Sequence, residues 1–218
     1  MMQSTVSTPL HANAGVAGRW IEGDTPPAPL AAALAPAIHE VGSPLYVVDM
    51  RVGHGVAQDG TAYLGRRASG DAGLPLVAHV PALLPGQLGD RGFCEAHGLR
   101  YAYVAGAMAN GITSEAIVEA MGHAGMLGFF GAAGLDLPRV EQAIDRIQDR
   151  LGAAPYGFNL IHSPNEPDLE DAVSDLYIRR GVRLVSASAY LGLTLPLVRY
   201  RLAGIHATAD GTIVTPNK

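Results

Sequence analysis

The chain has 218 residues, of which 48% are hydrophobic and 16% charged, so it can bury a sizeable core and is too apolar for a disordered protein. Its net charge of -5 argues against nucleic-acid binding, because nucleic-acid-binding proteins carry basic stripes. The single cysteine, Cys94, excludes an internal disulfide and a cysteine metal cluster, and it predicts a reducing, cytoplasmic location.

The first residues carry no pattern of a targeting or membrane segment. Residues 1–15 lack the basic and apolar regions of a signal peptide, and no apolar run reaches the roughly 20 residues of a membrane span. Three prolines within 26–29 favour a stiff, non-helical stretch, and a short alanine-rich helix is predicted over 30–41. We therefore expect residues 1–43 to be flexible or irregular.

Extended segments come next along the chain. Three runs predict short strands: Leu45–Met50, Gly53–Ala57 and Thr61–Gly65. Asp59 and Gly60 separate the last two runs, and Asp-Gly between extended segments favours a hairpin. A connector with a short helix over 90–97 follows. We predict that residues 44–98 form a small β-rich cap and connector.

From residue 101 strands and helices alternate. Apolar runs predict four strands: 101–105, 126–130, 156–162 and 182–187. Helical spacing predicts the helices that follow them: 114–123, 138–151, 169–180 and one from 196. Thr113 is predicted to cap the first helix and Gly181 to end the third. The second helix carries one apolar stripe: Val140, Ile144, Ile147 and Leu151.

Four βα units with short connections favour a parallel sheet. A doubly wound sheet and a (β/α)8 barrel both begin in this way, and a barrel takes about 250 residues. We expect nothing in the chain to cover the outer edge of the fourth strand, which an open sheet would leave bare. We therefore predict an α/β fold, a (β/α)8 TIM barrel of which residues 99–218 carry the first four βα units.

The active site of such folds lies at the C-terminal ends of the strands. Residues 105–111 have small side chains, so their backbone N–H groups either approach a flat ligand or serve only a tight turn. Asn159, near the mouth of an apolar strand, needs a ligand or a neighbouring strand as its partner. Alternating polar residues at the fourth strand end line a pocket or make ordinary sheet-end hydrogen bonds: Ser186, Ser188 and Tyr190.

Other motifs point away from common chemistries. His162 follows Asn159 by three residues, so strand alternation places it on the opposite face and we assign it no catalytic role. The histidines lack ligand spacing, which predicts no metal site. The chain has neither the dinucleotide-binding fingerprint Gly-x-Gly-x-x-Gly nor the nucleophile elbow Gly-x-Ser-x-Gly.

Three long stretches carry a resemblance to a known family: YAYVAGAMANGITSEAIVEAMGHAGMLGFFGAAG (101–134), PYGFNLIHSPNEP (155–167) and VSASAYLGLT (185–194). They resemble the PfaD family, the trans-acting enoyl reductases of polyunsaturated fatty acid and polyketide synthases, which are related to nitronate monooxygenases. PLYVVDM and LPLVAHVPALLPGQLGD also match, so the resemblance extends roughly from residue 44 to the end.

The resemblance implies that FMN and NAD(P)H reduce the C=C bond of an unsaturated acyl chain on an acyl carrier protein. Hydride passes from the nicotinamide through the flavin to the β-carbon, and a proton reaches the α-carbon. The resemblance further implies that one loop lies against the flavin with its backbone: Gly106, Ala107, Met108 and Ala109. Asn159 would contact FMN, and Ser186 and Ser188 would line the same mouth.

In the family, the phosphate-binding loops and a histidine-bearing segment lie beyond the position of Lys218. The resemblance therefore implies catalytic residues downstream and, if Lys218 is the terminus, poor FMN binding and no turnover by this chain alone. A second polypeptide that completes the barrel would change that expectation, and the uncovered strand edge favours a homo-oligomer.

Two alternatives stay open. One is a nitronate monooxygenase-like flavoprotein that acts on a small free substrate. The other is a non-catalytic fragment that docks on a synthase, with an arginine patch for an acidic carrier protein: Arg179, Arg180, Arg183, Arg199 and Arg201.

Overall fold

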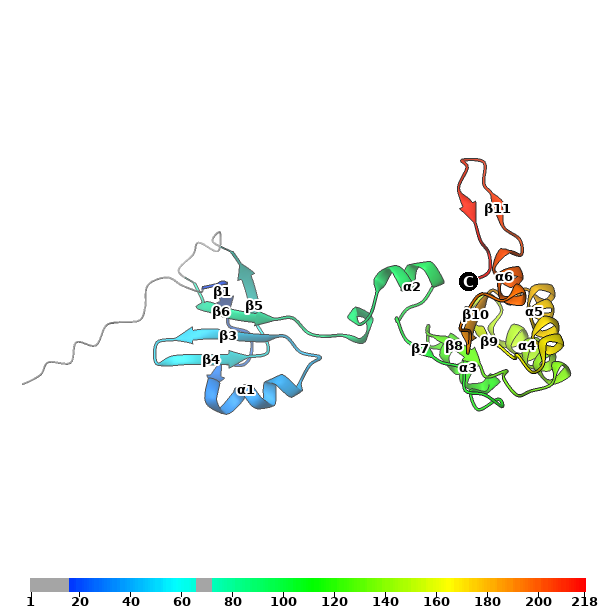
Figure 1. Ribbon diagram of the computed structural model, residues 1–218. Coiled ribbons are helices and arrows are strands. Elements are labelled where there is room, and N and C mark those ends of the chain that lie inside the picture. The colour runs from blue at the N-terminus through cyan, green and yellow to red at the C-terminus, as the bar shows by residue number, and fades with distance from the viewer. Residues whose placement is uncertain (1–15, 66–71) are drawn as a thin grey trace, which may run out of the picture. The chain divides into compact units, whose positions relative to one another are not determined.

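The computed structural model describes residues 16–65 and 72–218, and the chain divides into two compact units, Met1–Gln87 and Leu88–Lys218. Figure 1 shows the elements of both units, each of which is described by itself. Within the described ranges, no helix has both the length and the apolar character needed to cross a membrane.

The first unit is built on an antiparallel sheet with the strand order β2-β4-β3-β6-β1-β5. Its strands are β1 (Gly18–Ile21), β2 (Ala28–Pro29), β3 (Leu45–Met50), β4 (Gly53–Ala57), β5 (Thr61–Leu64) and β6 (Leu74–Val80). The helix α1 (Leu30–His39) packs on β3 and β4 through Ala37. A second cluster surrounds Trp20, which is fully buried, and a short 3-10 helix, η1 (Pro85–Gln87), follows the sheet. The predicted strand over 45–50 is confirmed.

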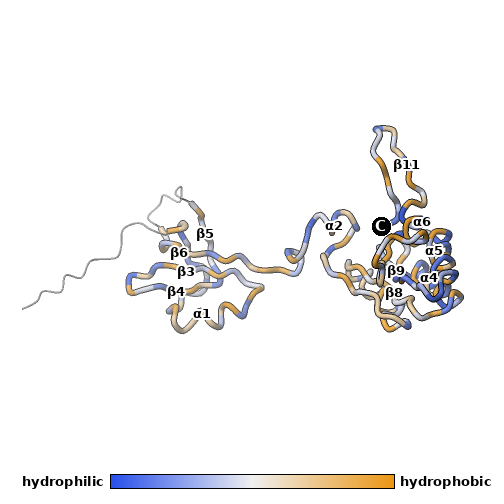
Figure 2. The backbone as a smooth tube through the Cα atoms, in the orientation of Figure 1, coloured by the Kyte–Doolittle hydropathy of each residue, from blue (hydrophilic) through white to orange (hydrophobic). Residues whose placement is uncertain are grey.

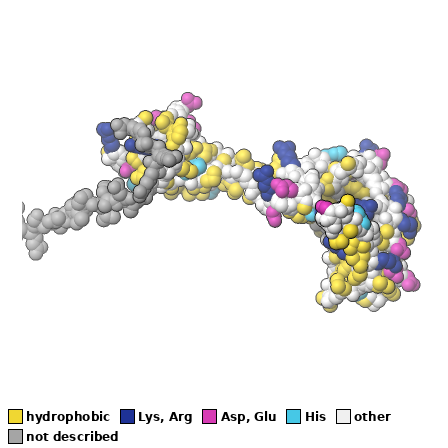
Figure 3. All heavy atoms as spheres, turned by 90° about the horizontal axis from the view of Figure 1, so that it is seen from above, with side chains coloured by type: hydrophobic (Ala, Val, Ile, Leu, Met, Phe, Trp, Pro, Cys, Tyr) yellow, Lys and Arg dark blue, Asp and Glu magenta, His cyan; other side chains and the backbone are white. Residues whose placement is uncertain are grey.

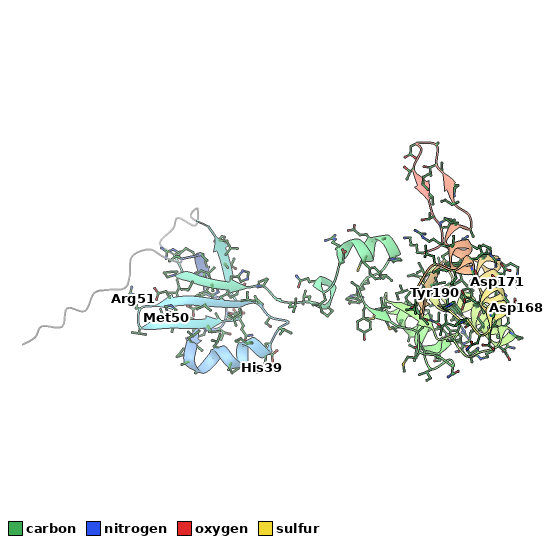
Figure 4. The ribbon with its side chains drawn as sticks, in the orientation of Figure 1. His39, Met50, Arg51, Asp168, Asp171 and Tyr190 are labelled. Atoms are coloured by element: carbon green, nitrogen blue, oxygen red, sulfur yellow. The ribbon has the colours of Figure 1, made fainter. Side chains whose placement is uncertain are left out.

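The predicted hairpin across Asp59 and Gly60 is wrong. β4 pairs with β3 through a turn at Arg51 and Val52, and β5 pairs with β1 instead of β4. Figure 4 labels Arg51 at the turn that ends β3. Asp59 and Gly60 do turn the chain, but Trp20 Nε1 donates to the Asp59 carbonyl oxygen at 2.9 Å and ties this turn to β1. This contact between Trp20 and Asp59 therefore determines that β5 pairs with β1.

Residues 16–43 are not irregular, which corrects the prediction for that part of 1–43, because they hold β1, β2 and α1. Residues 1–15 lie outside the described ranges. The predicted boundary at 43/44 cuts one continuous sheet and is therefore wrong. β6 was not predicted: Pro75 is unusual in a strand interior, yet pairing on both sides makes β6 a central strand. That this β-rich unit caps a barrel stays a prediction.

The second unit holds a parallel sheet with the order β10-β9-β8-β7. Its strands are β7 (Val104–Ala105), β8 (Leu127–Phe130), β9 (Gly157–Ile161) and β10 (Leu184–Ser188). Its helices are α2 (Arg91–His97), α3 (Glu115–His123), α4 (Leu137–Leu151), α5 (Pro167–Arg180) and α6 (Leu195–Leu202). A hairpin of β11 (His206–Ala207) and β12 (Ile213–Val214) follows α6. The predicted α/β class is confirmed, and closure into a barrel stays a prediction.

The helix α4 shows how apolar spacing builds this unit. Its predicted stripe is buried: Val140, Ile144, Ile147 and Leu151. Asp136 accepts a hydrogen bond from Arg139 N at 2.8 Å and so caps the helix start. Figure 2 shows hydrophilic residues along α4 and α5, whose other faces cover the sheet. The buried stripe and Gly181, which ends α5 at φ 65°, agree with the sequence predictions, whereas the Asp136 cap was not predicted.

The outer edge of β10 is covered at its start, which corrects the expectation of a bare edge. Lys218 N donates to the Arg183 carbonyl oxygen at 2.8 Å, and Val185 N donates to the Lys218 carbonyl oxygen at 2.9 Å. The buried Asn217 holds this segment on the end of α6, because its Nδ2 donates to the Tyr200 carbonyl oxygen at 2.7 Å. Residues 217–218 therefore lie alongside β10 as a further strand would.

Candidate cofactor site at the strand ends

The C-terminal ends of β9 and β10 bring together three of the predicted site residues. The two strands pair with Ser186 opposite Asn159. Asn159 Nδ2 donates to the Ser186 carbonyl oxygen at 3.1 Å and to Ser188 Oγ at 2.8 Å. Both serines therefore bear on the site by holding the amide of Asn159.

The amide of Asn159 is buried but only half satisfied. The residue is 5% exposed, and its Oδ1 has no hydrogen-bond partner in the described part of the chain. The amide orientation follows from chemistry, because the Ser186 carbonyl oxygen can only accept and so must face the nitrogen. An unpaired buried carbonyl costs about 1–3 kcal/mol. Asn159 thus presents an acceptor that the fold itself does not use.

Glycine is required two residues before Asn159. A Cβ at Gly157 would lie 2.3 Å from the ring of Phe129 and 3.0 Å from the Leu184 carbonyl oxygen. The Phe129 ring therefore lies directly over the backbone of β9. Because side chains alternate along a strand, Gly157 and Asn159 share one face, with the glycine making room for Phe129.

Thr113 holds the loop after β7 in shape. Its Oγ1 donates to the Gly106 carbonyl oxygen at 2.8 Å and accepts from Met108 N at 3.0 Å. The prediction that Thr113 caps α3 is wrong, because Ser114 is the N-cap residue and the Thr113 side chain turns back into the preceding loop. A buried hydroxyl with two partners inside one loop stabilises that loop rather than the helix.

The sequence predicted free backbone N–H groups in this loop, and some of them are free within the described ranges. The N–H group of Met108 is used by the loop itself, whereas those of Ala107 and Ala109 have no partner within the described ranges. The loop is pressed against the segment after β8, since a Cβ at Gly131 would lie 1.6 Å from the Met108 carbonyl oxygen. The loop and Asn159 both lie at the C-terminal end of the sheet. Because β8 separates β7 from β9, they are two strand spacings apart, about 10 Å.

A pocket of ≈ 340 Å³ opens beside Asn159, between the ends of β8 and β9 and the starts of α4 and α5. Its lining includes small residues after β8 and polar residues on and after β9: Ala132, Gly134, Asn159, Ser163, Glu166 and Glu170. The volume lies within the range of small-molecule sites. The loop 106–109 does not line this pocket. Asn159 is hydrogen-bonded to Ser186 and Ser188, whereas the loop is therefore a separate group at the same C-terminal end of the sheet.

Sequence reasoning missed the most heavily hydrogen-bonded side chain of this edge, Glu170 on α5. Its buried carboxylate accepts from four donors: His162 Nδ1 at 2.9 Å, Ser163 N at 3.0 Å, Tyr190 OH at 3.1 Å and Thr194 Oγ1 at 2.9 Å. Burial alone would raise the pKa of Glu170, but these hydrogen bonds outweigh it and lower the pKa below its ordinary value. An acidic residue near a helix start is common, so the sequence carried no distinct signal for it.

His162 lies on the opposite face of β9 from Asn159, as strand alternation predicted. Its backbone N donates to the Ser188 carbonyl oxygen at 3.0 Å and so extends the ladder between the strands. Its ring nitrogen contacts Glu170 on α5. His162 and Asn159 therefore do not approach one ligand from the same side.

The predicted polar stripe ends at Ser188. Sequence alternation placed Tyr190 on the same side as Ser186 and Ser188, but Ala189 adopts φ 61° and turns the chain. The Tyr190 hydroxyl consequently donates to Glu170, and Figure 4 shows the labelled Tyr190 close to the sheet. A left-handed alanine is strained and cannot be foreseen from alternation.

Known proteins are similar to about 60% of this chain in sequence, and one solved structure is similar in fold. No family model matches the chain. The chain is 46% identical over 133 residues to a component of the polyunsaturated fatty acid synthase of Thraustochytrium sp., covering 61% of this chain and 9% of that protein. It is 42% identical over 132 residues to the polyketide biosynthesis protein PksE of Bacillus subtilis, covering 60% and 17%. The solved enoyl reductase domain of MlnA, from the macrolactin cluster of Bacillus amyloliquefaciens, matches with a TM-score of 0.58 and 42% identity, over 60% of this chain and 30% of that one.

The resemblance to the PfaD family is confirmed. The chain nevertheless spans only 9% and 17% of the two curated relatives and 30% of the solved chain. What those whole proteins do, and with which partners, is therefore a proposal for this chain.

Most of the arginines predicted to dock a carrier protein form ion pairs or hydrogen bonds with other residues of this chain. Four of the five have partners: Arg180 with Glu141 and Asp145, Arg199 with Asp171 and Asp175, and Arg183 and Arg201 with Asn217. Figure 3 shows Lys and Arg side chains interleaved with Asp and Glu over the second unit. Carboxylates therefore pair with Arg180 and Arg199, whereas Arg183 and Arg201 contact an uncharged residue, and docking of a carrier protein on these arginines stays a prediction.

Proposed function

We propose that the second unit carries part of the active site of an FMN-dependent enoyl reductase with a (β/α)8 barrel. The enzyme uses NAD(P)H to reduce the α,β double bond of an acyl chain held on the acyl carrier protein of a polyketide or fatty acid synthase. Similarity to the MlnA enoyl reductase domain and to synthase proteins supports this reaction and this substrate class. The parallel βα repeat supports the barrel.

The free acceptor of Asn159 carries the cofactor part of the proposal. A flavin ring presents an N–H donor between two carbonyl groups, and Asn159 Oδ1 is a buried acceptor that lacks such a donor. The N–H groups of Ala107 and Ala109 offer donors for ring acceptors at the same sheet edge. The residues present therefore fit an FMN ring.

Each predicted site residue takes a distinct part in this arrangement. Bound FMN would supply hydride transfer from the nicotinamide to the acyl double bond. Asn159 binds the ring edge, and Ser186 and Ser188 keep its amide in the binding orientation. Gly106 and Met108 fix the loop through Thr113, so that Ala107 and Ala109 reach the ligand by their backbone.

A titration of the isotope-labelled chain with FMN tests this site, because NMR detects weak as well as strong binding. We expect saturable shifts of the Asn159 side-chain amide and of the backbone amides of Ala107 and Ala109. Asn159→Ala should weaken binding about 10-fold or more, the value of a lost buried hydrogen bond in a site. Asn165→Ala, at an exposed amide of the loop after β9, is the matched control and should bind as wild type.

The proposal fails if FMN shifts none of these resonances, or if Asn159→Ala and Asn165→Ala bind FMN equally. The substrate class is tested on the protein purified from its natural source with the polypeptides that accompany it. We expect NADPH-dependent gain of two hydrogens by a carrier-bound enoyl thioester. Oxygen uptake with a nitroalkane, and no change in the enoyl thioester, would contradict the proposed reaction.

A further inference from the structure

One carboxylate joins the two loops that leave β9 and β10. Two of the four donors to Glu170 follow β9, namely His162 and Ser163. The other two follow β10, namely Tyr190 and Thr194. The side chain of Glu170 is 3% exposed, so water does not compete for these bonds. Glu170 is therefore the shared anchor of both loops.

These loops are continuous with the residues that hold Asn159. Ser188, which accepts from Asn159 Nδ2, is two residues before Tyr190, and its carbonyl oxygen accepts from His162 N. Movement of either loop away from Glu170 would thus shift Ser188 and release the Asn159 amide. Glu170 is thus linked to the Asn159 amide through the Tyr190–Glu170 hydrogen bond, the turn at Ala189 and the Asn159–Ser188 hydrogen bond.

The turn between them is held in a strained form. Ala189 has φ 61°, a left-handed conformation that is unfavourable for an alanine because its Cβ approaches the following carbonyl oxygen. The rings of His162 and Tyr190 on either side of the anchor lie 5.3 Å apart at their centres. Strain of this kind persists only where surrounding contacts impose it, and the bonds to Glu170 are such contacts.

We propose that Glu170 is a positioning residue of the candidate site, which holds both loops so that Ser186 and Ser188 keep the Asn159 acceptor turned towards the ligand. The ligand in this statement rests on the proposed function. The position of the Asn159 amide does not rest on it, because the hydrogen bonds that hold the amide exist without FMN.

Two substitutions and one control test the proposal. Glu170→Gln keeps one acceptor oxygen and replaces the other with a donor, and Glu170→Ala removes both acceptors. The control is Ser174→Ala on the same helix, which removes the buried hydrogen bond from Ser174 Oγ to the Pro196 carbonyl oxygen at 3.0 Å and leaves all four donors to Glu170 in place. If Glu170→Ala does not fold, Glu170→Gln carries the test.

The first readout needs no ligand. We expect the side-chain amide resonance of Asn159, identified by its loss in Asn159→Ala, to move and to exchange faster with water in both Glu170 variants. In Ser174→Ala it should stay at the wild-type position. An unchanged Asn159 resonance in both Glu170 variants overturns the positioning role.

The second readout is FMN affinity relative to thermal stability. We expect about a 10-fold loss of affinity in Glu170→Gln and a larger loss in Glu170→Ala, as for other residues that orient a contacting group. Ser174→Ala should melt earlier but bind as wild type. If the loss of FMN affinity, divided by the fall in melting temperature, is the same in Glu170→Gln and Ser174→Ala, Glu170 has only a structural role. A wild-type chain that binds no FMN contradicts the proposed function alone, because the amide resonance still decides the positioning role.

Discussion

Replacing Asn159 with leucine separates a role in folding from a role in binding. The change removes two hydrogen bonds of the amide, together about 2 kcal/mol, and also the unpaired Oδ1, whose burial costs about 1–3 kcal/mol. Leucine keeps the branched shape, and the adjacent pocket of ≈ 340 Å³ accommodates its larger methyl groups. We therefore expect Asn159→Leu to unfold with a free energy within about 1 kcal/mol of wild type while FMN-dependent shifts disappear.

Urea unfolding followed by two signals measures this effect. Trp20 is the single tryptophan and lies in the first unit, so its fluorescence reports that unit, whereas far-UV circular dichroism reports mainly the helices of the second. The fluorescence transition should not move in Asn159→Leu and serves as an internal control. A loss of more than about 3 kcal/mol in the dichroism transition would refute the reasoning, because it would mean that the fold depends on this amide.

Three further predictions concern the same edge of the sheet. Thr113→Val should lower the unfolding free energy of the second unit by about 2 kcal/mol in urea titrations, since two loop hydrogen bonds are lost; an unchanged midpoint would contradict this. Gly131→Ala should displace the loop by forcing Cβ against the Met108 carbonyl oxygen and should cost about 1–3 kcal/mol, with NMR amide shifts over 106–109 as the check. The pKa of Glu170 is lowered in the folded chain, so the ionised carboxylate stabilises the fold above its ordinary pKa of 4.5, and this stabilisation is lost as the pH falls through the pKa of the folded chain. The difference in unfolding free energy between wild type and Glu170→Gln should therefore shrink as the pH falls through this range. A difference that stays constant with pH would contradict the prediction.

Local patterns were enough to predict most of the βα repeat. The stripe on α4 is buried because apolar residues at helical spacing face one side, and Gly181 ends α5 because glycine adopts a positive φ without strain. The opposite orientations of Asn159 and His162 followed from strand alternation alone. These features depend on residues a few positions apart, which a sequence displays directly.

The tertiary structure decided which distant groups meet. Trp20 Nε1 donates to the Asp59 carbonyl oxygen and ties the turn at Asp59 to β1, so β5 pairs with β1. The local sequence favoured a hairpin between β4 and β5 instead. Thr113 turned its hydroxyl into the loop instead of capping α3, because the Gly106 carbonyl oxygen lay within reach. Glu170 gained its four donors only when two loops converged on α5. Each outcome depends on hydrogen-bond partners brought together by packing, and such partners have no fixed spacing along the chain.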